Sequence, residues 1–116
     1  MSDSIFTKII NHEIPSTILF EDDDFIAIKD IYPKAPVHVL IIPKKAYESL
    51  EAVELEDDAF YAKLLKTTRL VAKNLGISEN YKLFMNVGKE MQDVPHLHLH
   101  LMGGFDKEKQ NSLFSE

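Results

Sequence analysis

Apolar and polar residues alternate with a period of two in the segments Tyr81–Val87 and His96–Met102, a pattern typical of β-strands. Val37–Ile42 is apolar and rich in β-branched residues, and prolines bound it on both sides, which predicts a buried strand. Two further strands are predicted at Thr17–Glu21 and Phe25–Lys29, on either side of a turn made of three aspartates. The pattern therefore predicts about five strands.

Helical spacing of apolar residues marks two other segments. Ile5–His12 is predicted to be a short helix, and Ser4 is the residue type that caps a helix N-terminus. A helical turn is expected within Ala46–Val53. A long helix is predicted after the acids of residues 54–58 and before Gly76, because one stripe carries Phe60, Leu64, Thr67, Val71 and Leu75. The expected fold class is α+β, with an antiparallel sheet, one long helix and one short helix.

The length of 116 residues fits a single domain that spans the whole chain, with a polar C-terminal tail at about 105–116. The chain is 45% hydrophobic and 28% charged, as is usual for a globular protein. Small domains bury a small fraction of their surface, and the long helix and a sheet edge add apolar surface. We therefore expect a homodimer.

The net charge of −6 argues against binding to long nucleic acid or to an anionic membrane by charge alone. It leaves room for a single phosphate that is held locally. The chain has no cysteine, which excludes disulfides, a thiol nucleophile and zinc held by thiolates. No apolar stretch approaches the length of a transmembrane helix, and the N-terminus lacks the pattern of a signal peptide. We expect a cytoplasmic protein.

The candidate chemistry is concentrated in His96, His98 and His100, three of only five histidines in the chain. The residues between and after them are all leucine. On a strand the three imidazoles share one face and the leucines share the other. We therefore expect the leucine face to be buried and the imidazole face to be left for chemistry. His38 lies in the strand Val37–Ile42 and would lie near the triplet if the two strands share a sheet.

Clustered imidazoles support two kinds of chemistry. Neutral imidazole is a common zinc ligand, and alternate positions on a strand can supply two ligands. Alternatively, one ring attacks phosphorus while the others orient it and move protons. The acids near the triplet in sequence are Glu90 and Asp93, and the spacing alone does not decide between a metal and a nucleophile. A purely structural triplet is less favoured, because an exposed strand face is seldom all histidine.

The run Val94–Leu101 resembles the signature of the histidine triad (HIT) family, in which histidine and apolar residues alternate. Other blocks resemble the Hint branch of that family and occur in the same order. The resemblance extends from about Ile5 to Gly104. These blocks are Ile5–Ile10, Glu13–Pro15, Phe20–Asp23, Asp30-Ile31, Pro33–Pro36, His38–Lys44 and Asn86–Gly88.

The resemblance implies a homodimer whose sheets join edge to edge and which hydrolyses purine nucleoside phosphoramidates and aminoacyl-adenylates. By position, His98 would be the nucleophile and would form a nucleotidyl-histidine intermediate. His100 would contact the phosphate and the leaving group. His38 and His96 would hold the network that sets the tautomer and charge of His98. The partner implied is a purine nucleotide of the AMP or GMP type.

The resemblance also implies a nucleotide-binding set. Asp30 would bind the ribose hydroxyls, and the base pocket would be lined by Phe6, Ile9, Ile31 and Leu40. From the sequence alone, core packing is the simpler interpretation of Phe6 and Ile31. The residues around the phosphate would be Asn86, Gln92 and Asp93, with His98 and His100.

One departure from the family pattern is the run Met91-Gln92-Asp93, where many relatives have glycine before the glutamine and serine or threonine after it. A carboxylate beside a phosphate repels it, unless the side chain of Asp93 points outwards and only its backbone N–H faces the substrate. An amine leaving group needs a nearby acid, and a phosphate needs donors. Imidazoles and amides supply both, so we expect no metal and no other cofactor.

Three alternatives stay open at this point. The first is a dinucleoside-polyphosphate hydrolase of the Fhit-like branch, which shares the triad. The second is a nucleotide-binding scaffold protein with residual catalysis. The third is a zinc protein without catalytic activity. Turnover measured with and without a chelator separates them.

Overall fold

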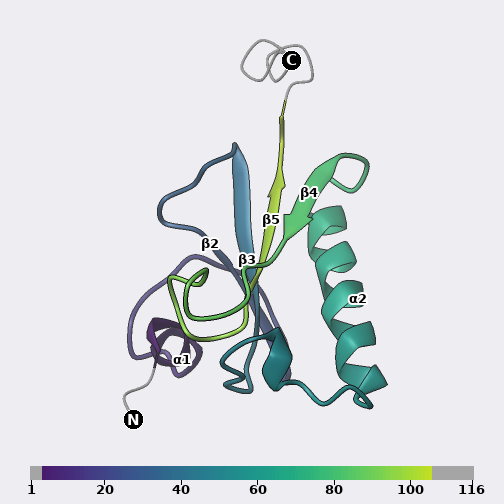
Figure 1. Ribbon diagram of the computed structural model, residues 1–116. Helices are drawn as coiled ribbons and strands as arrows, with labels where there is room; N and C mark the ends of the chain where they lie inside the picture. The colour runs from purple at the N-terminus through teal and green to yellow at the C-terminus, as the bar shows by residue number, and fades with distance from the viewer. Residues whose placement is uncertain (1–3, 106–116) are drawn as a thin grey trace.

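A five-stranded antiparallel sheet organises residues 4–105, the part of the chain that this computed structural model describes (Figure 1). The strand order is β1-β2-β3-β5-β4. In sequence order the strands are β1 (Ile18–Glu21), β2 (Phe25–Lys29), β3 (Val37–Pro43), β4 (Tyr81–Phe84) and β5 (Leu99–Gly103). The helices are α1 (Ile5–Ile10), a short 3-10 turn η1 (Leu50–Ala52) and α2 (Asp58–Asn74). The predicted α+β class, with one long and one short helix, is confirmed.

Two predicted strands have different limits in the structure. β4 ends at Phe84 rather than at residue 87, because Phe84 pairs with His100 near the start of β5, where the pairing of the two strands ends. β5 begins at Leu99, so His96 and His98 precede the strand. There the backbone N–H groups bond elsewhere: that of His96 donates to Val94 at 2.8 Å, and that of Leu97 donates to the carbonyl of Tyr47 at 2.8 Å.

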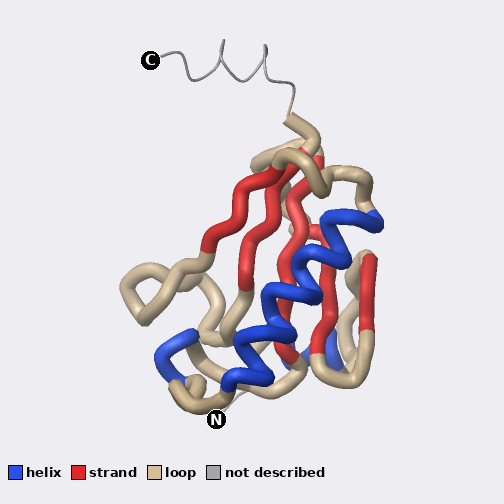
Figure 2. Tube along the Cα trace, turned by 90° about the vertical axis from the view of Figure 1, so that its right-hand side faces the viewer, coloured by secondary structure: helices blue, strands red, loops and turns tan. Residues whose placement is uncertain are grey.

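Helix α2 covers one face of the sheet, and Figure 2 shows it running across the strands. Its N-terminus is capped by Asp57, whose side chain accepts the N–H of Phe60 at 3.1 Å. Gly76, at φ +74°, follows its C-terminus as predicted. Its apolar stripe buries Leu64 and Val71 against a core that includes Val39, Ile41 and Leu101 from the central strands.

Helix α1 covers part of the other face. Ser4 caps it, as predicted, by accepting the N–H of Thr7 at 3.1 Å. Phe6 and Ile9 pack onto a second buried cluster with Ile26, Ile28, Leu40 and Ile42. The helix ends at Ile10 rather than at residue 12, because residue 12 already has a positive φ of 61°.

Within residues 4–105, no helix is both long and apolar enough to cross a membrane. The predicted tail lies outside the described residues from position 106 onwards. The single domain that the sequence predicts over residues 1–116 stays a prediction.

Gly103 allows β5 to pass close to the loop that follows α2, and its replacement should be costly. A Cβ at this position would lie 2.6 Å from Cδ1 and 3.1 Å from Cβ of Ile77. We expect Gly103→Ala to lower the free energy of unfolding by about 1–3 kcal/mol, because the added methyl overpacks a buried contact. Urea denaturation measures the change.

The control is the double variant Gly103→Ala/Ile77→Val, which removes the Cδ1 atom that the new methyl meets most closely. It should be destabilised by less than the sum of its two single variants. A Gly103→Ala protein as stable as the wild type would show that the close approach is unimportant.

Candidate active site

The predicted separation of leucine and imidazole faces is only partly correct. Leu97, Leu99 and Leu101 are buried as expected. However, His96 and His98 are also buried, with exposed fractions of 1% and 6%. Helix α1 is the reason, because the ring of Phe6 packs edge-on against both imidazoles, with ring centroids 5.9 and 4.9 Å apart. Of the three, only the imidazole of His100 is partly exposed.

The ring of His96 is held from both sides. Its Nε2 lies 2.9 Å from the carbonyl oxygen of Pro43. A carbonyl only accepts hydrogen bonds, so Nε2 carries the proton and Nδ1 of the neutral ring is an acceptor. The hydroxyl of Ser4 lies 3.1 Å from that Nδ1, and the hydroxyl of Thr7 lies 3.4 Å from it. The neutral Nε2–H tautomer of His96 is therefore fixed by its partners.

His98 is oriented by the backbone of His96. Its Nδ1 lies 2.7 Å from the carbonyl oxygen of His96, so Nδ1 carries the proton and donates it. The lone pair of the neutral ring is then on Nε2. Among residues 4–105, Nε2 of His98 makes no hydrogen bond. An imidazole nitrogen with a free lone pair is a nucleophile.

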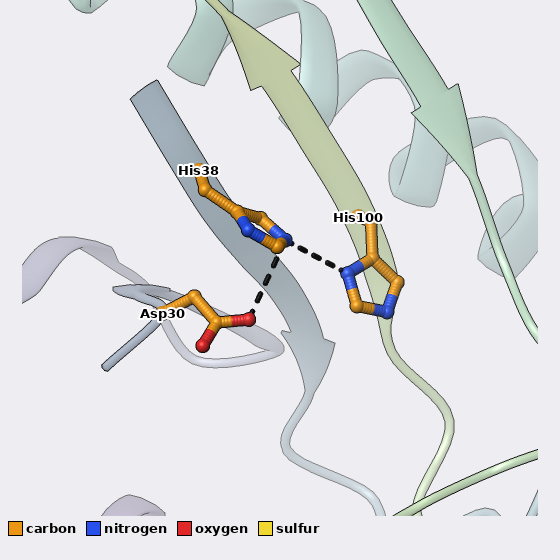
Figure 3. A group of neighbouring side chains, drawn as sticks. All are labelled: Asp30, His38 and His100. Atoms are coloured by element: carbon orange, nitrogen blue, oxygen red, sulfur yellow. Dashed lines mark hydrogen bonds and ion pairs between the residues drawn. The ribbon is translucent and has the colours of Figure 1, made fainter. Parts of the chain in front are cut away.

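A second chain of contacts fixes His38 and His100 (Figure 3). The backbone N–H of Lys34 donates to Nδ1 of His38 at 3.1 Å, so the proton of neutral His38 is on Nε2. This Nε2–H lies 3.0 Å from Nδ1 of His100 and 3.4 Å from Oδ2 of Asp30. Nδ1 of His100 is then the acceptor, and the proton of the neutral His100 ring is on Nε2.

Burial keeps these imidazoles neutral. It lowers the pKa of His38, although the carboxylate of Asp30 opposes the shift. It also lowers the pKa of His96. The pKa of His100 falls to about 4, mainly through burial and then through the neighbouring His98 and His38. The tautomers described above for His38, His96 and His100 are therefore the relevant ones at neutral pH.

The two sets of contacts place an imidazole nitrogen with a free lone pair on the ring next to one that presents an N–H. The lone pair of His98 Nε2 and the N–H of His100 Nε2 are on rings whose centroids are 5.1 Å apart. The prediction that His38 joins the triplet is confirmed, because β3 pairs with β5 and brings Leu40 opposite His100. The arrangement suits attack on phosphorus with a protonated leaving group.

Sequence reasoning missed Phe84. Its ring stacks on that of His100, with centroids 4.5 Å apart and planes within 3° of parallel. The contact depends on the register that pairs Phe84 with His100 across β4 and β5. A strand prediction does not include register, so no pattern in the chain could have indicated it.

The residues predicted to bind the base and the ribose differ in how deeply they are buried. Phe6, Ile9 and Leu40 are buried, whereas Ile31 is 73% exposed in the loop after β2. Asp30 is half-buried and accepts the N–H of Tyr32 through Oδ1 at 2.9 Å. Its two oxygens thus each have one protein partner, and a carboxylate oxygen can accept a further hydrogen bond.

The residues predicted for the phosphate lie in or before the loop 88–95. Asn86 is half-buried and Asp93 is exposed. The amide of Gln92 is fully engaged within the protein. Its Oε1 accepts the N–H of Gly88 at 2.7 Å, and its Nε2 donates to the carbonyls of Glu48 at 2.9 Å and Val94 at 3.1 Å. Gln92 therefore shapes the loop with its side chain.

Asp30, His38 and His100 also meet the geometric needs of a metal site. One ligand atom from each lies within 4.8 Å of the others. A carboxylate and two imidazoles suit a divalent transition metal. A metal here would displace the proton that His38 Nε2 shares with His100, so metal binding and the hydrogen-bonded arrangement exclude each other.

The chain belongs to the HIT family, whose domain matches residues 11–107. It is 50% identical over 103 residues to an uncharacterized HIT-like protein of Synechocystis, covering 88% of this chain and 90% of that one. It is 44% identical over 106 residues to the adenylylsulfatase HINT1 of Arabidopsis thaliana, covering 89% and 72%. A HIT family hydrolase from Clostridium thermocellum superposes with a TM-score of 0.85 at 45% identity, covering 92% and 95%.

Proposed function

We propose that this protein hydrolyses the P–N bond of purine nucleoside 5′-phosphoramidates, and also aminoacyl-adenylates, through a nucleotide bound covalently to His98. The observation that carries the proposal is the free lone pair on Nε2 of His98, opposite the Nδ1–H that donates to the carbonyl of His96 at 2.7 Å. Membership of a family that includes hydrolases supports the reaction type. The name of the Arabidopsis relative, an adenylylsulfatase, supports an adenylyl-containing substrate.

In the first step, Nε2 of His98 attacks phosphorus and the bond from phosphorus to the amine breaks. The departing nitrogen takes up one proton from solvent, so the amine leaves neutral, while the Nε2–H of His100 stays on its ring and donates a hydrogen bond to the reacting group. His98 then carries a positive charge, which its Nδ1–H shares with the carbonyl of His96. The buried surroundings keep water from competing with this arrangement.

In the second step, water attacks phosphorus on the opposite side and the bond to His98 Nε2 breaks. The water releases one proton to solvent, which balances the proton used in the first step, and both rings are back in their starting tautomers. The products are a nucleoside monophosphate and the free amine. No metal takes part, so a chelator should leave the rate unchanged.

Substrate binding in this proposal uses the predicted set. Asp30 binds the ribose hydroxyls through its remaining acceptor sites. The pocket for the base is lined by Ile31 and by the side chains of Phe6, Ile9 and Leu40. Asn86 and the loop that Gln92 braces surround the phosphate, where the backbone N–H of Asp93 donates.

Turnover of adenosine 5′-phosphoramidate with and without a chelator tests the proposal. Release of AMP that a chelator does not slow supports it. Faster cleavage of a dinucleoside polyphosphate would favour the Fhit-like alternative. Tight AMP binding with negligible turnover would favour a scaffold, and loss of AMP release with the chelator would favour a metal at Asp30, His38 and His100.

Asp93 should tune the rate without being required. It is exposed in the loop next to Gln92, and its carboxylate opposes the charge of the phosphate. We expect Asp93→Ser to raise kcat/KM by a factor of about two to ten at low salt, and the gain should shrink as salt screens the charge. Steady-state kinetics across a salt series measure this.

The matched control is Glu90→Ser, which removes an exposed carboxylate from the same loop. It should have a smaller effect. A hundredfold loss in Asp93→Ser would instead assign the carboxylate a part in proton transfer.

We further propose that residues 1–116 form one HIT domain that acts as a homodimer in the cytoplasm, joined through the edge strand β4. Leu83 and Phe84 on this strand are 38% and 39% exposed, and Leu65 and Leu70 of α2 are 53% and 45% exposed. The lack of cysteine fits a reducing compartment.

Sedimentation should give twice the 13.3 kDa of the chain at micromolar concentration. Leu83→Lys should produce the monomer, because a lysine on an edge strand opposes pairing. Ile18→Lys on β1, the opposite edge, is the control and should stay dimeric. A wild-type monomer would contradict the proposal.

A further inference from the structure

Ser4 makes two hydrogen bonds of different kinds at the start of α1. Its Oγ accepts the backbone N–H of Thr7 at 3.1 Å, which caps the helix. The same Oγ lies 3.1 Å from Nδ1 of His96, 92 residues away in the sequence. Nδ1 is an acceptor because Nε2 donates to Pro43, so the Ser4 hydroxyl proton points to His96. One side chain therefore caps a helix and holds a buried imidazole.

Thr7 completes the contact. Its Oγ1 lies 3.4 Å from the same Nδ1 and 3.3 Å from Oγ of Ser4. Phe6, between them in sequence, packs against the rings of His96 and His98. The first turn of α1 thus packs against the two buried histidines of the triplet, His96 and His98. His96 is 1% exposed, so no bulk water replaces a hydroxyl lost from this site.

We propose that the hydroxyls of Ser4 and Thr7 are positioning groups for His98, which act by holding the ring of His96 and thereby the backbone carbonyl that binds Nδ1–H of His98. The chain of contacts is continuous: hydroxyl to His96 Nδ1 at 3.1 Å, His96 Nε2–H to Pro43 at 2.9 Å, and His98 Nδ1–H to the His96 carbonyl at 2.7 Å. The kinetic part of this inference rests on the proposed function, whereas its structural part does not.

The double role restricts the residue that position 4 can carry. Asn, Asp and Ser cap helices about equally well, and Gly costs only a few tenths of a kcal/mol relative to Ser. A carboxylate, however, has no proton to donate to an acceptor Nδ1. It instead favours a proton on that nitrogen, either through the other tautomer or through the imidazolium. Only Ser and Thr cap the helix and donate through one hydroxyl, so Ser4→Thr should preserve function.

Four variants separate the two roles. Ser4→Gly/Thr7→Val removes both hydroxyls and leaves at the N-cap a glycine, which this position tolerates almost as well as serine. Ser4→Asp keeps the cap and reverses the hydrogen bond to His96, because a carboxylate accepts a proton from Nδ1 instead of donating one to it. Ser4→Thr is the conservative rescue. Lys8→Gly is the matched control, because it weakens α1 by about 0.5–1 kcal/mol and leaves both hydroxyls in place.

The first readout is the ring-nitrogen NMR spectrum of each histidine, which reports tautomer directly and needs no turnover. In the wild type and in Lys8→Gly and Ser4→Thr, we expect His96 protonated at Nε2 and His98 at Nδ1. In Ser4→Asp, His96 should become protonated at Nδ1. In Ser4→Gly/Thr7→Val and in Ser4→Asp, the Nδ1–H of His98 should exchange faster with solvent by about tenfold or more, as its acceptor loosens.

The second readout is kinetic. Ser4→Gly/Thr7→Val and Ser4→Asp should lower kcat by about 10- to 100-fold, the usual cost of a misoriented reactive group, with KM changed less than threefold. Ser4→Thr and Lys8→Gly should stay within about threefold of wild type.

The inference is overturned if His98 keeps its tautomer and its slow Nδ1–H exchange in Ser4→Gly/Thr7→Val, or if Lys8→Gly reproduces the losses. A wild-type protein that does not cleave the phosphoramidate would defeat the proposed function alone. In that case the NMR comparison still decides whether the first turn of α1 positions His98.

Discussion

His98→Ala should abolish turnover and leave nucleotide binding largely intact. The substitution deletes the nitrogen that attacks phosphorus, so the covalent route is closed. The groups proposed to bind the nucleotide, Asp30 and the apolar residues near it, stay in place. We expect kcat to fall by about ten-thousandfold or more, the scale seen when a nucleophile is removed. Single-turnover kinetics measure the rate, and calorimetry with AMP should give a Kd within about fivefold of wild type.

His12→Ala is the matched control, because it removes a histidine that lies outside the buried cluster, with its side chain 63% exposed. It should retain wild-type kinetics. If His98→Ala kept a rate within about tenfold of wild type, His98 would not be the nucleophile. If it lost AMP binding as well as turnover, the ring would serve mainly to build the pocket.

Acidification should destabilise the protein between about pH 6.5 and pH 4. A histidine whose pKa is lowered by folding binds fewer protons in the folded chain than in the unfolded chain over this window. The free energy of unfolding is therefore highest above pH 6.5 and falls as the pH decreases. His100, with its pKa lowered to about 4, should account for on the order of 2 kcal/mol after allowance for its partial exposure. His38 and His96 act in the same direction.

Urea unfolding at a series of pH values measures this dependence. Glu21 and Asp22 have pKa values lowered from 4.5 and 3.8, so their contribution is lost mainly below pH 4.5, at the acid end of the histidine window and beyond it. His100→Gln should reduce the slope between pH 6.5 and 4.5. His12→Gln should leave most of it, because His38, His96 and His100 are untouched. Stability that is flat across this window would contradict the neutral, buried state of the cluster.

The sequence predicted α2 from its periodic pattern because the helix buries one stripe, and it predicted β3 from a continuous apolar run because this strand is buried on both faces. The stripe with Leu64 and Val71, the acids at the start of α2 and Gly76 after its end all appear as expected. The limits of β4 and β5 could not be predicted. They depend on the loop 88–95, where the side chain of Gln92 bonds to the backbone of Gly88 and of the distant Glu48, and on Leu97, whose N–H donates to the carbonyl of Tyr47.

The sequence predicted that the histidines lie close together, but it did not predict how deeply they are buried. Three alternate histidines with His38 on a neighbouring strand indicated a shared site, and the structure confirms it. The imidazoles are nevertheless mostly buried, because α1 folds over them from the far end of the chain. The contacts of Ser4 with His96 and of Phe84 with His100 depend on tertiary packing and register, which a local pattern does not contain.

The intact mass of the protein after brief mixing with an adenosine phosphoramidate tests the central claim most directly. The phosphoramidate should carry aniline as its leaving group. Because aniline departs readily, the intermediate on His98 should form faster than it is hydrolysed, and it should accumulate. We predict a transient mass increase of one adenylyl group, mapped to His98 and absent in His98→Ala. Full release of AMP with the protein mass unchanged at every time point would contradict the account.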